Sequence, residues 1–145
     1  MMLRGGVLRE IVYVSTPTRP IGNGDISALL TRAREKNERL GVTGMLLLVA
    51  GGFLQLLEGP TDVMDPLVES IRRDQRHSDL TVILQREIER RSFPDWPMGY
   101  RRLDPGDPKL KGFNDLPHRP ADFVQSEKAQ GLAAKLLRGF QTSHR

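Results

Sequence analysis

Two apolar runs separated by a pair of glycines restrict the possible folds of this chain more than any other feature. Residues 42–50 and 53–58 are largely apolar, and Gly51-Gly52 stands between them. Adjacent glycines reach the positive φ angles of a tight turn, so the pattern predicts a β-hairpin. Side chains of a strand alternate between its two faces. The second strand should therefore carry Phe53, Gln55 and Leu57 on one face and Leu54, Leu56 and Glu58 on the other.

Gln55 is the polar exception on its face. Because both faces of the strand are mostly apolar, we expect both to be covered, which places the Gln55 amide inside the protein. A buried amide without a hydrogen-bond partner costs about 1–3 kcal/mol. Gln55 therefore needs a partner, and the pattern leaves a neighbouring backbone carbonyl or hydroxyl and a polar ligand both open.

The N-terminal part of the chain predicts a strand followed by a helix. Residues 8–15 alternate in the manner of a strand, with Tyr13 on an apolar face. Prolines and glycines make 16–24 a loop. Asp25 can then cap a helix that runs to about Leu40.

Asn37 occupies an unusual place on this helix. The helical period puts it in the apolar stripe, eleven positions after Ile26 and three before Leu40. An amide there suggests a polar ligand or a polar network between helix and sheet. A local hydrogen bond near Gly41, where the helix ends, explains the same pattern equally well.

The next elements complete an alternation of strands and helices. A second helix is expected from Thr61 or Asp65 to about Asp74, with a proline in its first turn. Strands are expected at 78–89 and 98–103. The order βαββαββ predicts an α+β sandwich of the ferredoxin-like type, with a mixed sheet and both helices on one of its faces.

The C-terminal part is expected to cover the other face of the sheet. Residues 104–120 are rich in Pro, Gly and Asp and predict a loop, while 127–140 have apolar side chains at helical spacing. This helix could cover the bare face or pair with a second chain, and we prefer the first because the leucines of the hairpin need burial there. We therefore divide the chain into a domain at 1–103 and a loop-and-helix extension of that domain at 104–145.

Composition argues against several classes of protein. The single domain of 145 residues has no Cys and three scattered His, which offers neither a disulfide framework nor a metal site. Its net charge of +4 comes from 22 basic and 18 acidic residues that are interspersed, as on a solvated surface rather than a nucleic-acid interface. The N-terminus does not look like a secretory signal, and no apolar run approaches the roughly 18 residues of a membrane span. We expect a cytoplasmic protein without nucleic-acid or membrane partners.

Six short segments resemble the BLUF domain, a flavin-binding blue-light sensor, in order and in spacing over residues 8–103. A single segment of this kind is weakly specific, whereas six in register are strongly specific. They are YVS at 13–15, REKN at 34–37, GVTGMLLL at 41–48, FLQLLEGP at 53–60, DQRH at 74–77 and RSFPDWPMGY at 91–100.

The resemblance implies a ferredoxin-like fold with a flavin between the two helices, above the sheet. Asn37 matches the family's flavin-binding asparagine, whose amide can offer a donor and an acceptor to the uracil-like edge of the ring. Tyr13 and Gln55 match the photoactive tyrosine and glutamine. In the family, blue light moves an electron and then a proton from the tyrosine, and the glutamine rearranges its hydrogen bonds. The resulting red-shifted state decays in the dark.

Five further positions are implied by the resemblance. Lys36, Asp74 and His77 match positions that line the cofactor, although a solvated charge and a surface His explain the last two equally well. Trp96 and Met98 match a pair on the last strand that relays the state of the glutamine outward. Ordinary core packing is the competing interpretation of that pair.

The resemblance also implies the cofactor, which we expect to be FAD, with FMN or riboflavin as alternatives. Lys36 and Ala33 depart from the family, since many members carry His or Asn at the first position and Ser at the second. The hydrogen bonds around the flavin are therefore expected to differ in this chain.

The implied function is a blue-light photoreceptor and not an enzyme. No cyclase-like or related effector segment follows residue 145, so we expect output through a separate effector protein or through a homo-oligomer. One alternative is an acylphosphatase-like hydrolase on the same fold. Such an enzyme would hold phosphate with an arginine in a glycine-rich loop after the first strand. The sequence disfavours it, because the arginine after the first strand, Arg19, lies between Thr18 and Pro20 and not in a glycine-rich loop. The other is a BLUF-like interaction module that binds no flavin.

Overall fold

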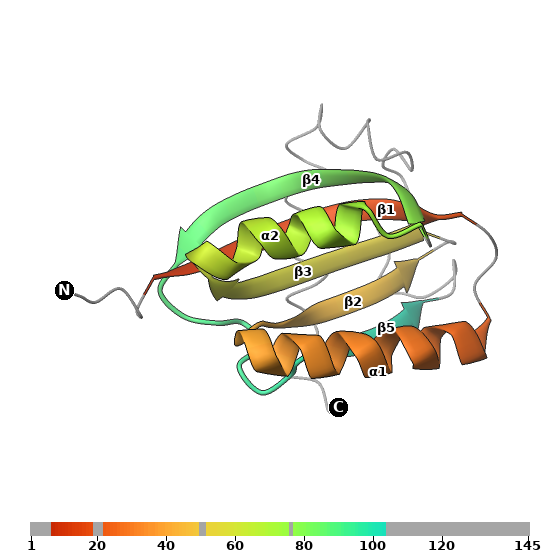
Figure 1. The fold of residues 1–145 in the computed structure, drawn as a ribbon, viewed down its shortest axis with the longest axis horizontal. Coiled ribbons are helices and arrows are strands. Elements are labelled where there is room, and N and C mark those ends of the chain that lie inside the picture. Colours follow the sequence, from red (N-terminus) through yellow and green to blue (C-terminus); the bar gives the residue numbers. More distant parts are fainter. Residues whose placement is uncertain (1–6, 19–21, 50–51, 76, 104–145) are drawn as a thin grey trace.

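A computed structural model describes residues 7–18, 22–49, 52–75 and 77–103 of the chain. They form two helices and five strands in the predicted order (Figure 1). The elements are β1 (Leu8–Pro17), α1 (Asn23–Leu40), β2 (Thr43–Val49), β3 (Gly52–Pro60), α2 (Thr61–Arg72), β4 (His77–Ile88) and β5 (Gly99–Leu103).

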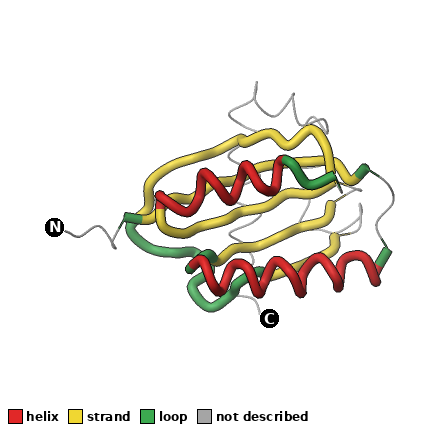
Figure 2. Tube along the Cα trace, viewed as in Figure 1, coloured by secondary structure: helices red, strands yellow, loops and turns green. Residues whose placement is uncertain are grey.

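The five strands form one mixed sheet in the order β4-β1-β3-β2-β5. β1 runs antiparallel to β3 and β4, β2 runs antiparallel to β3, and β5 runs parallel to β2. Both helices lie on the same face of this sheet, α2 over β1 and β3 and α1 toward the β2–β5 side (Figures 1 and 2). The predicted α+β ferredoxin-like arrangement is therefore confirmed.

The predicted hairpin is present, and its second strand begins one residue earlier than predicted. β2 and β3 pair from Thr43 opposite Glu58 to Val49 opposite Gly52. Gly52 thus belongs to β3 rather than to the turn, contrary to the prediction. The two connecting residues, 50–51, lie outside the described residues.

Helix α1 begins two residues before the predicted start. Asp25 lies inside the first turn, where its carboxylate accepts the backbone N–H of Gly22 at 3.2 Å. Such a position satisfies one of the amides that a helix leaves unpaired at its N-terminus. The helix ends at Leu40, and Gly41 caps it with a φ of 72°, in the left-handed region that glycine adopts without strain.

Helix α2 begins at Thr61, the earlier of the two predicted starts. Pro66 consequently lies within the helix rather than in its first turn, where it was expected. The helix ends at Arg72, and Asp74 donates its N–H to the carbonyl of Ile71 in the turn that follows. Asp74 is therefore placed just past the helix and not on it.

Apolar side chains fill both faces of the sheet, as the alternation predicted. One cluster lies under the helices and the other on the opposite face. Phe53 and Leu57 belong to the first cluster, and Leu54 and Leu56 belong to the second. The expected loop at 104–120 and helix at 127–140 lie outside the described residues. Neither described helix has the length and apolar character that crossing a membrane requires.

Candidate functional site

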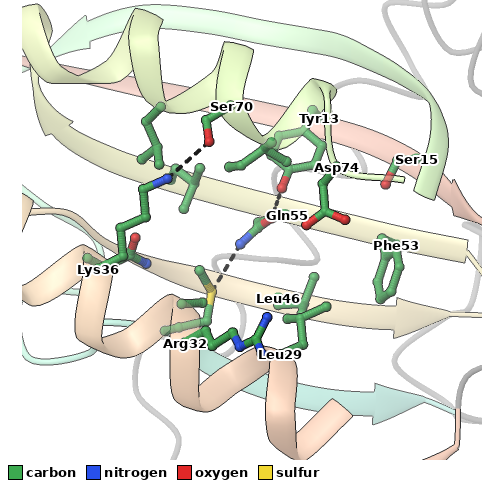
Figure 3. A pocket seen from close by; sticks show the side chains of 16 residues that line it. Tyr13, Ser15, Leu29, Arg32, Lys36, Leu46, Phe53, Gln55, Ser70 and Asp74 are labelled. Carbon is green, nitrogen blue, oxygen red and sulfur yellow. Dashed lines mark hydrogen bonds between the residues drawn. The ribbon is translucent and has the colours of Figure 1, made fainter. Parts of the chain in front are cut away.

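A cavity of about 170 Å³ lies between α1 and α2, above the middle of the sheet. Its walls are mostly apolar, and they include Leu29, Leu46, Leu57, Leu67 and Ile71. The three polar side chains that the sequence placed on buried faces, Tyr13, Asn37 and Gln55, all line it. Figure 3 shows the cavity with Tyr13 and Gln55 on its floor and Lys36 and Arg32 extending from α1.

Tyr13 and Gln55 face each other from neighbouring strands. They are register partners in the β1–β3 pairing, so their side chains leave the same face of the sheet side by side. The Tyr13 hydroxyl donates a hydrogen bond to Oε1 of Gln55, and both side chains are buried (Figure 3). Burial, assisted by the negative charge of Asp74, raises the pKa of Tyr13 well above its usual range. The phenol is therefore a neutral donor at physiological pH.

The other end of the Gln55 amide contacts Met98. Its Nε2 donates to the Met98 sulfur at 3.1 Å, and Met98 is buried in the cavity wall. A thioether sulfur only accepts hydrogen bonds. The amide orientation follows from its two neighbours, with the oxygen toward Tyr13 and the nitrogen toward Met98. Gln55 therefore has a protein hydroxyl as a hydrogen-bond partner, which was one of the two alternatives left open by the sequence. It also lines the cavity, where a ligand could reach it.

Asn37 connects helix α1 to the segment that precedes β5. Its side chain is buried, and Nδ2 donates to the carbonyl of Pro97 at 2.6 Å. The alternative of a local side-chain hydrogen bond near Gly41 is therefore wrong. It is the backbone carbonyl of Asn37 that bonds locally, accepting the N–H of Val42 at 2.9 Å. Oδ1 of Asn37 accepts no hydrogen bond from the described part of the chain. An acceptor on the cavity wall thus remains for a ligand.

Charged and hydroxyl side chains of both helices surround the cavity mouth. Lys36 donates from Nζ to the Ser70 hydroxyl at 3.1 Å, which links α1 to α2 (Figure 3). Arg32 lies one turn before Lys36, and Asp74 lines the cavity next to the end of α2 (Figure 3). Lys36 and Asp74 are therefore brought to the cavity. His77 begins β4, opposite Pro17, and its side chain lies outside the described part of the chain.

Ser15 is a cavity residue that the sequence reasoning missed. It lies two residues after Tyr13 on β1, and the alternation that located Tyr13 also places Ser15 on the helix-covered face. Its hydroxyl is buried and has no hydrogen-bond partner among the described residues. A buried hydroxyl without a partner is costly in a finished protein interior. Together with the Asn37 oxygen and the apolar walls, it fits a flat, apolar ligand with polar edges, such as a flavin ring.

Trp96 and Met98 lie before the last strand and not on it. β5 begins at Gly99, so both residues belong to the turn that leads into it, which corrects the prediction. Met98 lies in the cluster under the helices, and Trp96 lies in the cluster on the opposite face, where its ring is 5.5 Å from that of Phe93. The same short segment therefore reaches both faces of the sheet.

No group of three or more metal-ligating side chains occurs within the described ranges. Arg19, which the hydrolase alternative invoked, lies outside them.

The chain is similar to a known family of proteins over most of its length. The family model "BLUF: Sensors of blue-light using FAD" matches residues 8–99. Photoactivated adenylate cyclase subunit beta is 40% identical over 92 residues in Euglena longa and 38% identical over 92 residues in Euglena gracilis. Each match covers 63% of this chain and 11% of the relative, so the chain spans about a tenth of the length of these proteins.

Solved structures show the same fold. BlrB, described as a BLUF protein in its dark state, is 27% identical with a TM-score of 0.75, over 97% of this chain and 100% of that one. Klebsiella pneumoniae BlrP1, solved with FMN and cyclic diGMP, is 27% identical with a TM-score of 0.62, over 92% of this chain and 35% of that one. The likeness thus extends to whole short chains and to parts of longer ones.

Proposed function

Because this chain belongs to the BLUF family of flavin-dependent blue-light sensors, we propose that Tyr13 and Gln55 are its light-responsive pair and that Asn37 holds the flavin. The observation that carries the proposal is the hydrogen bond from Tyr13 to Gln55 in the floor of the cavity. It connects a group that can release an electron and a proton to a group that can reverse its hydrogen-bonding pattern.

The residues of the cavity suit a flavin ring by shape and by polarity. The apolar walls exclude water from its faces, and Asn37 Oδ1 and the Ser15 hydroxyl supply polar contacts at its edges. A bound flavin would absorb the blue light and accept an electron. All remaining steps belong to side chains of this chain.

Tyr13 has a direct proton acceptor in Gln55. A phenol that has lost an electron is a strong acid, so its proton would pass along the existing hydrogen bond to Oε1 of Gln55. An amide that carries a proton on oxygen can change tautomer or reverse its orientation, because its two ends exchange the roles of donor and acceptor. Gln55 would then present a different pattern of hydrogen bonds to the cavity and to Met98.

FAD is the proposed cofactor form, in agreement with the description of the family. The cavity would hold the ring, while the ribityl and phosphate groups would extend through its mouth. Arg32 and Lys36 place two positive charges there, which favours a phosphorylated flavin, FAD or FMN, over riboflavin. Asp74 belongs to the same rim and is proposed as a ribityl-side contact.

The proposed output is a surface change that a separate effector or a second copy of the chain detects. BLUF domains are sensors, and the cyclase activity of the relatives is a property of proteins of which the match covers only 11% of the length. Trp96 and Met98 are proposed as the relay, because Met98 contacts Gln55 while Trp96 reaches the opposite face of the sheet. The cytoplasmic location and the division at residue 103 stay predictions from the sequence.

An absorption spectrum in the dark, during blue illumination and in dark recovery tests the function. The wild-type protein should be yellow and show a reversible red shift of its flavin bands. Tyr13→Phe and Gln55→Leu should bind flavin and lack the shift. An undiminished shift in either variant would reject the assigned roles, and hydrolysis of acyl phosphates by a colourless protein would favour the hydrolase alternative.

A further inference from the structure

Glu58 is buried on the face of β3 opposite to that of Gln55, three residues further along the strand. Three donors converge on its carboxylate. Oε1 accepts the N–H of Ser92 at 2.8 Å, and Oε2 accepts the N–H of Phe93 at 2.7 Å and the hydroxyl of Thr43 at 3.0 Å. Burial raises the pKa of Glu58, and the three hydrogen bonds oppose that rise by stabilising the carboxylate. The turn after β4 is therefore fastened to the central strand of the sheet.

Arg91 binds the same turn to the sheet through further hydrogen bonds. Its Nη1 donates to the Thr43 hydroxyl at 2.9 Å and to the backbone carbonyl of Glu58 at 3.2 Å. Its Nη2 donates to the carbonyl of Gly41 at 2.6 Å. Residues 91–93 are thereby attached to β2, to β3 and to the residue that caps the C-terminus of α1.

The other end of this segment lies at the cavity. Beyond the Phe93–Trp96 ring contact, the carbonyl of Trp96 accepts the N–H of Gly44 at 3.0 Å. Met98 then contacts Gln55 through its sulfur. A single segment of eight residues, 91–98, thus runs from the Glu58 carboxylate on one face of the sheet to the Gln55 amide on the other.

We propose that Glu58 is a positioning residue for the light response, because its carboxylate holds residues 91–93 in place so that a rearrangement of Gln55 displaces Trp96. Because the carbonyls of Trp96 and Pro97 are bound to Gly44 and Asn37, a segment that is loose at 91–93 would take up a movement of Met98 at its free end. A segment fixed there must change shape between the fixed end and Met98, which is where Trp96 lies. The inference rests on the proposed function, since it requires Gln55 to be the residue that responds to light.

Glutamine cannot replace Glu58 in this role. Glu58→Gln has almost the same shape, but one acceptor oxygen becomes an NH₂ group that faces a donor. Depending on which oxygen is replaced, the N–H of Ser92 or that of Phe93 then loses its acceptor. The substitution therefore loosens the turn without opening a large cavity.

The test uses Trp96, which is the single tryptophan of the sequence. Its emission is recorded in the dark and under blue light, together with the red shift of the flavin, for the wild type and for Glu58→Gln. Glu10→Gln is the matched control. Glu10 is 1% exposed, is the register partner of Glu58 on β1, and accepts from Arg86 at 3.0 Å.

We expect Glu58→Gln to keep the red shift and to lose most of the light-induced change in Trp96 emission, whereas Glu10→Gln keeps both signals. The inference is overturned if the full Trp96 change survives in Glu58→Gln, if Glu10→Gln loses it equally, or if folded Glu58→Gln loses the red shift as well. It is also overturned if the wild type shows a red shift without a Trp96 change.

A wild type without any red shift would instead reject the proposed function. Should Glu58→Gln fail to fold, Thr43→Val removes one donor to Glu58 and one acceptor of Arg91 at nearly constant volume. This variant should then show a reduced Trp96 change beside a normal red shift, and an unreduced change would overturn the inference.

Discussion

The side-chain nitrogen of Gln55 and the sulfur of Met98 are 3.1 Å apart, and this contact sets which way the amide points. Tyr13 could hydrogen-bond either end of an amide, because a hydroxyl both donates and accepts. Met98 could not, since its sulfur has no hydrogen to donate. The observed orientation, with oxygen toward Tyr13, is thus the one that satisfies both neighbours. Met98 therefore selects the orientation of the Gln55 amide in addition to packing in the core.

Met98→Leu should therefore make the amide less selective between its two orientations. Loss of a weak hydrogen bond of about 0.5–1 kcal/mol would raise the fraction of reversed Gln55 in the dark by about two- to five-fold. The measurement is the red-shifted fraction of the flavin spectrum before illumination. Met64→Leu is the control, because Met64 is buried in the same cluster and does not line the cavity. An unchanged dark spectrum in Met98→Leu would show that the sulfur does not select the orientation.

The sequence alone was sufficient to place Gln55 and Asn37 on buried faces. Strand alternation identified the face of Gln55, and the helical period identified the face of Asn37, because both periods are set by backbone geometry. The order of the elements was predictable for the same reason. Asn37 and Gln55 also stand out as amides in otherwise apolar stripes, which is a signal that a single sequence carries.

The partners of these residues could not be predicted in the same way. That Asn37 bonds Pro97 and that Gln55 bonds Met98 depends on how the irregular segment before β5 crosses the edge of the sheet, for which no periodicity exists. The role of Glu58 was missed for a related reason. Its partners are backbone N–H groups of a turn, and a backbone donor leaves no mark on the sequence.

Tyr13 should make the stability of the fold depend on pH in the alkaline range. Its folded-state pKa is raised by burial and by Asp74, whereas an unfolded tyrosine ionises near pH 10. Above that pH the unfolded chain releases a proton that the folded chain retains, so stability falls as pH rises, by about 1.4 kcal/mol per pH unit. Relative to Tyr13→Phe, the wild type should lose about 2 kcal/mol of unfolding free energy by about pH 11.5.

Urea unfolding of both proteins between about pH 8 and 11.5 measures this difference. Tyr100→Phe provides the comparison. The pKa of Tyr100 is also raised by burial, but nearby Arg102 opposes the shift and the side chain is only half-buried. Its contribution to the alkaline loss should be the smaller one. Parallel pH profiles for wild type and Tyr13→Phe would mean that the Tyr13 hydroxyl is accessible to solvent in the folded protein.

Arg32 should discriminate between flavins by the charge of their tails. It lines the cavity mouth, is exposed, and has no hydrogen bond or ion pair within the described residues. An exposed ion pair is worth about 0.2–1 kcal/mol, so Arg32→Ala should lower the affinity for FMN by about 1.4- to five-fold and leave that for riboflavin unchanged. Flavin fluorescence titrations give both constants.

Arg39→Ala is the matched control for that experiment, because Arg39 lies on the same helix, is exposed, and does not line the cavity. The effect of Arg32→Ala should also diminish at high salt, since screening weakens exposed charge pairs. Equal losses for FMN and riboflavin would show that Arg32 contacts the ring side of the ligand or acts through the fold.

Gly99 should be intolerant of a side chain because Trp96 lies where its Cβ would stand. A Cβ at this position would approach Trp96 Cε3 to 2.3 Å and the Met45 sulfur to 2.7 Å. Gly99→Ala must therefore displace the indole ring, and overpacking of this kind costs about 1–3 kcal/mol. Because Trp96 precedes Met98 by two residues, the substitution should also alter the dark spectrum of the flavin.

Gly24→Ala is the control, since its Cβ would meet no atom within 4 Å and alanine favours the helix. A loss of thermal stability and a shift of the Trp96 emission maximum should occur in Gly99→Ala alone. An unshifted emission maximum would show that the indole ring had not moved.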